Sequence, residues 1–350
     1  MSTELADRIR AAHAAKAPLR IRGGGSKDWY GGALSGAILD VSGQRGIVSY
    51  EPGELVLVAR CGTPLAEIET LLEQNGQMLS FEPPHFGDAA TLGGTLACGF
   101  GGPRRAYAGS ARDMVLGLRL LDGRGQALSF GGQVMKNVAG YDVSRLMVGA
   151  LGTLGVILEA SLKVLPRPAA ELTLKFEMDE AEAILKMNQW SGQPLPLSAS
   201  TWVGGALMLR LSGAETAVRA AHEKLGGEIR EHGTNFWRAA REQSAAFFSA
   251  SELPLWRLSV PSACPPLDLP GRQALTWGGA QRWLKSDAPA NVVRATTAAA
   301  GGHATLFRGG DKRAGVFHPL PESLMKYHRR LKAQFDPEGI LNPGRFYPEL

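Results

Sequence analysis

Residues 19–27 read Leu-Arg-Ile-Arg-Gly-Gly-Gly-Ser-Lys, a short strand-like run that stops at three consecutive glycines. Because glycine has no Cβ, successive backbone N–H groups in such a turn can converge on an anion. Two more glycine clusters follow, Thr-Leu-Gly-Gly-Thr-Leu-Ala-Cys-Gly-Phe-Gly-Gly at 91–102 and Gly-Ala-Leu-Gly-Thr-Leu-Gly at 149–155. One such cluster alone is best explained as a tight turn. Three in one half of the chain favour a pocket for a diphosphate.

The distribution of glycine and the length of the chain indicate two unlike parts. Of the 44 glycines in 350 residues, 27 precede residue 167 and 17 follow it. This length allows two or three domains at about 100–200 residues each, and excludes a single small module. The prolines at 166 and 168 mark the boundary, because proline ends regular structure before it. We therefore expect the unusual backbone to lie in the first part.

Charge and cysteine content exclude several functions. The net charge of +5 is spread among acidic residues, so nucleic acid is not expected as a partner. The basic run at 326–332 is interpreted as the solvated face of a helix, with a docking patch as the alternative. Cys61, Cys98 and Cys264 are far apart in sequence, which predicts neither a disulfide framework nor a metal site. The N-terminus lacks a signal-peptide pattern, so we expect a cytoplasmic protein.

Local patterns predict alternating helices and strands, with one long loop. Residues 3–16 have helical spacing, 87–102 read as almost entirely loop, and 156–164 alternate like a strand with one solvated face. In the second part, Asp179 precedes Glu182 by three residues, as in a capping box, at the start of a helix to about Trp190. Further strands at 172–176, 206–212 and 303–307, and a helix at 321–335, predict an α+β second domain with an antiparallel sheet.

Common catalytic motifs are missing from the sequence. A G-x-G-x-x-G fingerprint fails because Arg104 stands where the third glycine belongs, and no Walker loop, H-E-x-x-H or G-x-S-x-G occurs. Nicotinamide, nucleotide-hydrolysis, zinc-hydrolase and serine-esterase chemistry therefore lose support.

The order of these motifs resembles a known flavoprotein family. The strand with its Gly-Gly-Gly-Ser turn, the prolines at 83 and 84, and the segments at 90–97, 107–113 and 152–157 resemble the FAD domain of the vanillyl-alcohol oxidase (PCMH) type. The tail at 336–345, Asp-Pro-Glu-Gly-Ile-Leu-Asn-Pro-Gly-Arg, resembles the end of the D-lactate dehydrogenase and glycolate oxidase branch. Taken whole, the chain resembles the smaller FAD-binding subunits of bacterial glycolate oxidases.

The resemblance implies a domain plan and a cofactor site. It implies a PCMH-type FAD domain of two α/β subdomains over 1–167, a shorter α+β cap over 168–330, and a segment at 331–350 that returns to the first domain. The residues it implies for FAD binding are Arg22, Gly23, Gly24, Gly25, Ser26, Lys27, Pro84, Thr91, Leu92, Gly93, Gly94, Thr95, Ala97, Gly109, Arg112, Asp113, Gly152, Gly155, Val156 and Ile157. Many relatives attach FAD through a histidine after the glycines, whereas Ser26, Lys27 and Asp28 follow here, so we predict noncovalent FAD.

The substrate chemistry is the open part of the sequence interpretation. Oxidation of a 2-hydroxy acid needs a base for the hydroxyl proton and a cation for the carboxylate. His303, Arg308 and His318 are the candidates in the second half, and the alternative for each is an ordinary surface or satisfied polar group. Family members that act alone carry paired metal-binding histidines in the cap, and this chain has no equivalent. No metal site is predicted.

The resemblance also implies partners. These are a larger homologous flavin subunit and an iron–sulfur subunit that passes electrons towards quinone, with glycolate or D-lactate as the substrate and at most a peripheral place on the inner face of the cell membrane. Two alternatives stay open, a non-redox scaffold that retains the FAD fold and a free-standing flavin-dependent 2-hydroxy acid oxidoreductase.

Overall fold

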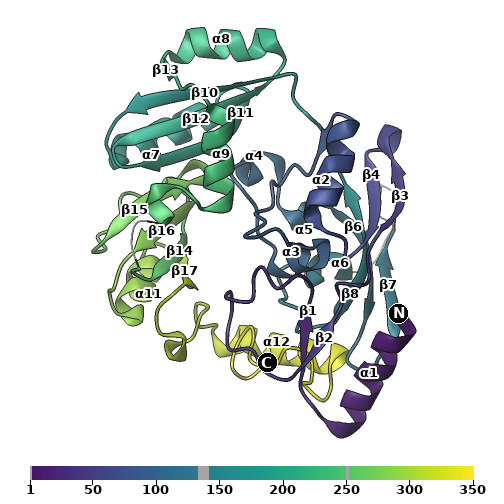
Figure 1. Cartoon of the computed structure of the whole chain (residues 1–350). Coiled ribbons are helices and arrows are strands. Elements are labelled where there is room, and N and C mark those ends of the chain that lie inside the picture. Colours follow the sequence, from purple (N-terminus) through teal and green to yellow (C-terminus); the bar gives the residue numbers. More distant parts are fainter. Residues whose placement is uncertain (1, 133–141, 250–251) are drawn as a thin grey trace. The chain divides into compact units, whose positions relative to one another are not determined.

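The computed structural model describes residues 2–132, 142–249 and 252–350, and the chain forms two compact units (Figure 1). The first unit contains residues 1–100, 110–166 and 319–350, and the second contains 101–109 and 167–318. Each unit is described separately below.

The first unit alternates short strands and helices. Its elements are α1 (Ser2–Ala15), β1 (Leu19–Arg22), β2 (Ala37–Asp40), β3 (Ile47–Glu51), η1 (Pro52–Glu54), β4 (Val56–Arg60), α2 (Leu65–Gln74), β5 (Gln77–Met78), α3 (Leu92–Cys98), α5 (Ala111–Met114), β6 (Val115–Leu121), β7 (Ala127–Gly131), α6 (Val143–Met147), β8 (Val156–Lys163), β9 (Leu165–Pro166) and α12 (Glu322–Phe335). The predicted helix at 3–16 and the strand at 19–22 are confirmed.

A five-stranded sheet in the order β3-β4-β8-β6-β7 is the centre of the first unit. Helices α2, α3 and α5 cover one of its faces and bury their apolar side chains there (Figure 1). The prediction that residues 156–164 have one solvated face is wrong. The central strand β8 contributes Ile157 and Leu162 to this core, and Val156 and Leu158 to a second core beneath α1. Both faces of β8 are thus covered, and only Glu159 and Lys163 are half-buried.

A smaller parallel pair stands beside this sheet in the first unit. Strand β1 pairs with β2, and Leu19 also forms a parallel bridge with Leu341 of the C-terminal tail. The backbone N–H of Leu19 donates to the carbonyl of Ile340 at 2.7 Å, and that of Asn342 donates to the carbonyl of Leu19 at 2.9 Å. The tail therefore joins this pair through one parallel bridge at the start of β1.

The second unit is built on one large sheet. Its elements are α4 (Arg105–Ala108), β10 (Ala170–Glu177), α7 (Glu180–Ser191), β11 (Leu197–Val203), β12 (Ala206–Gly213), α8 (Glu215–Leu225), β13 (Glu228–Ile229), α9 (Gly233–Glu242), α10 (Ala246–Ser249), β14 (Leu255–Ser259), β15 (Arg272–Thr276), η2 (Trp277–Gly279), β16 (Gln281–Lys285), α11 (Ala290–Ala299), β17 (His303–Arg308) and η3 (Lys312–Ala314). The eight strands lie in the order β13-β10-β12-β11-β15-β16-β14-β17, and every described pairing is antiparallel.

Successive side chains along the strands of this sheet point to its two opposite faces. Leu207 and Leu209 of β12 pack with α7 and α8, while the intervening Met208 packs with Trp237 of α9. The predicted N-cap of α7 is confirmed, because the Asp179 carboxylate accepts a hydrogen bond from the backbone N–H of Glu182 at 2.8 Å, which is one half of a capping box. A strand has this two-residue period, so helices can cover both faces.

The two units differ from the predicted domain limits in two places. Residues 101–109 group with the second unit, where the indole of Trp277 donates to the carbonyl of Gly102 at 2.9 Å and Arg104 pairs with Glu171. Helix α12 lies wholly in the first unit, since Leu331 and Phe335 pack against its core. Within the described ranges, no helix has the length and apolarity required to cross a membrane.

Candidate cofactor-binding site

The turn after β1 offers a row of unused backbone donors. The amides of Gly23, Gly24, Gly25 and Ser26 donate no hydrogen bond to any acceptor in the described parts of the chain. All four residues line one pocket of the first unit. Converging backbone N–H groups without side chains form an anion-binding concavity. This turn therefore has the donor set that a diphosphate requires.

Glycine is required in this turn because the walls of the pocket are in close contact. A Cβ on Gly24 would lie 1.4 Å from the carbonyl oxygen of Ala89, and one on Gly23 would lie 2.5 Å from the Oγ1 of Thr91. Gly25 has a φ of +73°, which side chains rarely adopt. The first glycine cluster is thus constrained both by packing and by its place in the pocket.

The second glycine cluster contains a helix, so the prediction that residues 87–102 are almost all loop is wrong. Thr91 caps α3 by accepting a hydrogen bond from the backbone N–H of Gly94 at 3.3 Å. A Cβ on Gly93 would lie 2.9 Å from the Cβ and carbonyl oxygen of Cys61, so the helix packs too closely there for any side chain. Glycine is unfavourable in a helix interior, so the glycine-rich composition of this segment predicted a loop where the structure has α3.

The two faces of α3 separate the residues predicted from this cluster. Gly93, Gly94, Ala97 and Cys98 line the pocket. Leu92 and Thr95 are fully buried on the opposite side, with Leu92 in the main core, so the structure does not bring them to the pocket. A helical period of 3.6 residues accounts for this division.

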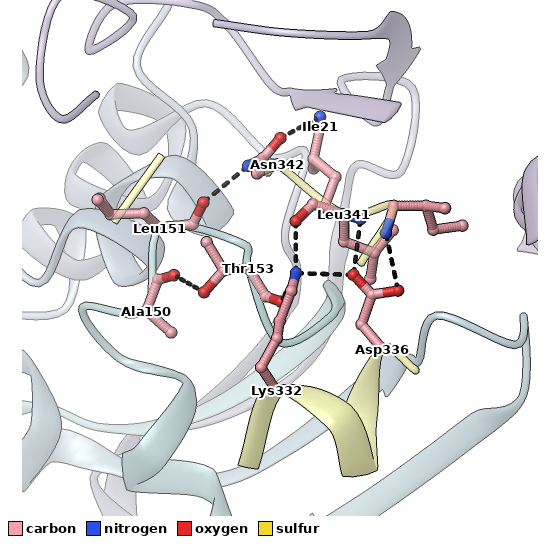
Figure 2. A network of polar contacts seen from close by, with 9 residues as sticks. Ile21, Ala150, Leu151, Thr153, Lys332, Asp336, Leu341 and Asn342 are labelled. Carbon is pink, nitrogen blue, oxygen red and sulfur yellow. Dashed lines mark hydrogen bonds and ion pairs between the residues drawn. The ribbon is translucent and has the colours of Figure 1, made fainter. Parts of the chain in front are cut away.

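The third cluster forms the opposite wall of the pocket and is held by the tail. Gly152, Gly155, Val156 and Ile157 line the pocket, as does Leu151. Figure 2 shows Asn342 between β1 and this loop: its Oδ1 accepts from the backbone N–H of Ile21 at 2.8 Å, and its Nδ2 donates to the carbonyl of Leu151 at 2.7 Å. A Cβ on Gly152 would lie 2.8 Å from that Nδ2.

Arg345 adds a buried cation to the pocket lining. Its guanidinium donates to the carbonyls of Gly32 and of Asp28, the latter at 2.9 Å, and burial lowers its pKa. The structure places Arg345 in the lining of the cofactor pocket. The sequence signal for both tail residues was the run from Asp336 to Arg345, but its contact with β1 could not be located from the sequence.

The charge of the pocket suits a diphosphate. Among the described residues, the pocket is lined by Arg22, Lys27 and Arg345 and by one carboxylate, Asp28, which pairs with Arg20 and, at 3.3 Å, with the Nε of Arg22. The Lys27 ammonium donates to the carbonyl of His85 at 3.0 Å and to the hydroxyl of Ser26 at 3.2 Å. The pocket encloses about 770 Å³ of space, including the solvent at its mouth. An excess of cations over carboxylates lowers the cost of binding a phosphate group.

Fourteen of the residues predicted to bind FAD line this pocket: Arg22, Gly23, Gly24, Gly25, Ser26, Lys27, Thr91, Gly93, Gly94, Ala97, Gly152, Gly155, Val156 and Ile157. Residues lining it that were not predicted as cofactor ligands are Ile21, Asp28, Leu34, Val41, Cys98, Leu151, Asn342 and Arg345. Burial raises the pKa of the Cys98 thiol to about 11. The three clusters thus converge on one site together with the tail.

Four more predicted residues lie away from the pocket. Pro84 is buried elsewhere in the first unit, and Gly109 ends α4 in the second unit. Arg112 is exposed and donates to the carbonyl of Val148 at 3.0 Å, while the Asp113 carboxylate accepts from Ser110 to cap α5. The side chains of Arg112 and Asp113 therefore form hydrogen bonds within the local structure.

The three substrate candidates do not form one group. His303 and Arg308 stand at opposite ends of β17, which puts them about 16 Å apart along the strand. His318 lies near His303, and its Nδ1 accepts from the backbone N–H of Ala304 at 3.4 Å. Arg308 instead donates to the side chain of Gln243 at 3.1 Å. Among the residues that the structure describes, no group of histidine, cysteine and carboxylate side chains could hold a metal ion.

Comparison with known proteins assigns this pocket to a class of flavoproteins. Residues 2–131 match the model of an FAD binding domain, and residues 309–346 match the C-terminal domain of FAD linked oxidases. Glycolate oxidase subunit GlcE of Escherichia coli (strain K12) is 52% identical over 349 residues, covering 100% of this chain and 98% of that protein. The chain therefore belongs to the family of FAD-linked oxidoreductases that includes this glycolate oxidase subunit.

Some other relatives match less than half of this chain. Glycolate oxidase subunit GlcD of Bacillus subtilis is 32% identical over 137 residues, which covers 39% of this chain and 27% of that protein. A D-lactate dehydrogenase of Archaeoglobus fulgidus is 32% identical over 170 residues, covering 47% of this chain and 37% of that protein. The solved structure of p-cresol methylhydroxylase with bound substrate covers 99% of this chain and 87% of its own, with a TM-score of 0.72 at 15% identity. The predicted fold class, a PCMH-type FAD domain with an antiparallel α+β domain, is confirmed.

Proposed function

We propose that this chain is the FAD-carrying subunit of a complex that oxidises glycolate, and also D-lactate, to the corresponding 2-oxo acid. The four unused amides at residues 23–26, in a pocket with three cations, are the observation that carries the cofactor assignment. In the proposed site these amides, with Lys27 and Arg22, hold the diphosphate, and Val156 and Ile157 border the cofactor. FAD supplies an acceptor for the electrons removed from a substrate.

The FAD is proposed to be noncovalent. Among the described residues that line the pocket, none is a histidine or a tyrosine. Cys98 lines the pocket with a thiol, and burial disfavours its thiolate, the reactive form. Acid precipitation of the purified protein should release the flavin into the supernatant, and yellow colour retained in the pellet would contradict this proposal.

The substrate is proposed from the full-length similarity to a glycolate oxidase subunit. Within this chain, His303 and Arg308 are too far apart to hold the hydroxyl and the carboxylate of one small acid. We therefore propose that oxidation needs a larger homologous flavin subunit, and that an iron–sulfur subunit passes electrons on towards quinone. The complex would be cytoplasmic, at most peripheral on the inner face of the membrane.

A spectroscopic experiment tests the proposal. The purified chain should show flavin absorbance at ~450 nm that glycolate and D-lactate leave unchanged. Once the partner subunits are added as well, this absorbance should bleach. Absence of flavin would support the alternative of a non-redox scaffold. Bleaching by glycolate with the isolated chain would instead support a free-standing oxidoreductase, and His303, Arg308 and His318 would then be examined first.

A further inference from the structure

Lys332 of α12 is a buried ammonium whose three donors are all used in the first unit. Its Nζ donates to the carbonyl of Thr153 at 2.7 Å, to the carboxylate of Asp336 at 2.7 Å and to the carbonyl of Leu341 at 2.8 Å (Figure 2). The interpretation of the basic run at 326–332 as a solvated helix face therefore fails at Lys332, whose side chain is 8% exposed. An ammonium has three donors and no acceptor, so this group is fully satisfied.

Asp336 fixes the tail from the other side of the ion pair. Its side chain is fully buried, and its two oxygens accept from the backbone N–H of Ile340 at 3.1 Å and of Leu341 at 2.7 Å. Lys332 and Asp336 thus connect the end of α12, the tail and the loop at 149–155. The loop lies far from α12 and the tail in the sequence, and both the loop and the tail line the cofactor pocket.

The loop at 149–155 is held on both sides of Gly152. Asn342 binds the carbonyl of Leu151, and Lys332 binds the carbonyl of Thr153, so the pocket residue Gly152 lies between two fixed peptide groups. The hydroxyl of Thr153 also donates to the carbonyl of Ala150 at 2.7 Å, which tightens the turn. Placement of the pocket wall thus depends on Lys332, which does not line the pocket, as well as on Asn342, which does.

Stability alone does not account for a buried ion pair. Replacing such a pair with apolar side chains of similar volume is often neutral or stabilising, whereas removing one partner leaves an uncompensated charge. An apolar pair could fill the space at Lys332 and Asp336, but it could not bind the carbonyls of Thr153 and Leu341. We infer that Lys332, paired with Asp336, is a positioning residue that holds the 149–155 loop and the tail in the arrangement that binds FAD. The inference rests on the proposed function.

Three variants test the inference: Lys332→Met, the double variant Lys332→Met with Asp336→Leu, and Lys326→Met as a control at an exposed position of the same helix. The measurements are the FAD dissociation constant by flavin fluorescence, the absorption spectrum of bound flavin, and the melting temperature without FAD. Lys332→Met should raise the dissociation constant at least about tenfold and lower the melting temperature, because it breaks charge-assisted hydrogen bonds. Lys326→Met should change neither.

The double variant separates positioning from stability. We expect its melting temperature to recover towards that of the wild type, while its FAD dissociation constant stays at least about tenfold high and its flavin spectrum stays altered. If Lys332→Met fails to fold, the double variant carries the test alone. Wild-type FAD affinity in the double variant, or in Lys332→Met, would overturn the positioning role. Failure of the unchanged chain to bind FAD would overturn the proposed function as well.

Discussion

Two pocket glycines, Gly24 and Gly94, separate the demands of packing from those of cofactor binding. At Gly24 an added Cβ would overlap the carbonyl of Ala89, so Gly24→Ala should cost about 2 kcal/mol or more of the free energy of unfolding without FAD. At Gly94 the nearest atom, the Oγ1 of Thr91, would be 3.4 Å away. Gly94→Ala should therefore gain about 0.5–1 kcal/mol from helix propensity, yet bind FAD at least about tenfold more weakly.

Denaturant unfolding and fluorescence titration with FAD measure both effects. Equal FAD affinity in Gly94→Ala and the wild type would show that α3 does not approach the cofactor at this position. A stable Gly24→Ala protein would show that the 19–27 segment can move away from Ala89.

Cys98 provides a chemical probe of the same pocket. Burial holds its pKa at about 11, so its alkylation by iodoacetamide should be slow at pH 7 and accelerate about tenfold per pH unit up to pH 10. Bound FAD should protect it, because Cys98 lines the pocket. Mass spectrometry of the modified peptide with and without FAD measures the protection, and Cys98→Ser identifies the site. Equal labelling in both samples would place the cofactor away from α3.

At the scale of elements, two histidines at and near β17 predict that the second unit becomes less stable in acid. Burial lowers the pKa of His303 and of His318 below the ordinary 6.5, and Arg257 and Arg294 respectively add to the shift. As the pH falls below 6.5, the unfolded chain binds protons that the folded unit does not, so stability is lost. The loss ends below the lowered pKa values. His303 is exposed in the structure, so it contributes less of this loss of stability than His318 does.

Denaturant unfolding at pH 7.5, 6.5 and 5.5 checks this dependence. In the double variant His303→Gln and His318→Gln, the free energy of unfolding should fall less as the pH is lowered, because neither side chain then titrates. An unchanged slope in this variant would assign the acid sensitivity to other groups, such as His328 in the first unit, whose pKa burial also lowers.

Some helices and strands could be predicted from the sequence, and others could not. Strands β1, β10, β12 and β17 and helix α7 followed from periodicity and capping, which are local signals. Helix α3 did not, because the close contact that requires glycine at Gly93, the one with Cys61, exists only in the folded chain. Leu92 and Thr95 were assigned to the pocket from the family resemblance, and only the folded helix shows that both are fully buried away from it.

At the scale of the whole molecule, long-range contacts complete the site. Asn342 binds the backbone of Ile21 across 321 positions of sequence, and Lys332 binds Thr153 across 179. The sequence indicated that the tail belongs with the first domain through its resemblance to a family. It could not indicate which atoms meet, because the first bond depends on the register of β1 against the tail and the second on how α12 packs beside the 149–155 loop.

Separate cores in the two units predict two unfolding transitions. The clusters beneath α1 and around α2 belong to the first unit, and those of the large antiparallel sheet belong to the second. FAD at 100 times its dissociation constant should stabilise the unit that holds the pocket by about 2.7 kcal/mol, because it binds only the folded form. Differential scanning calorimetry with and without FAD should show one transition moving and the other staying. Two transitions that move together would show that the units unfold as one cooperative body, and that FAD stabilises the entire chain.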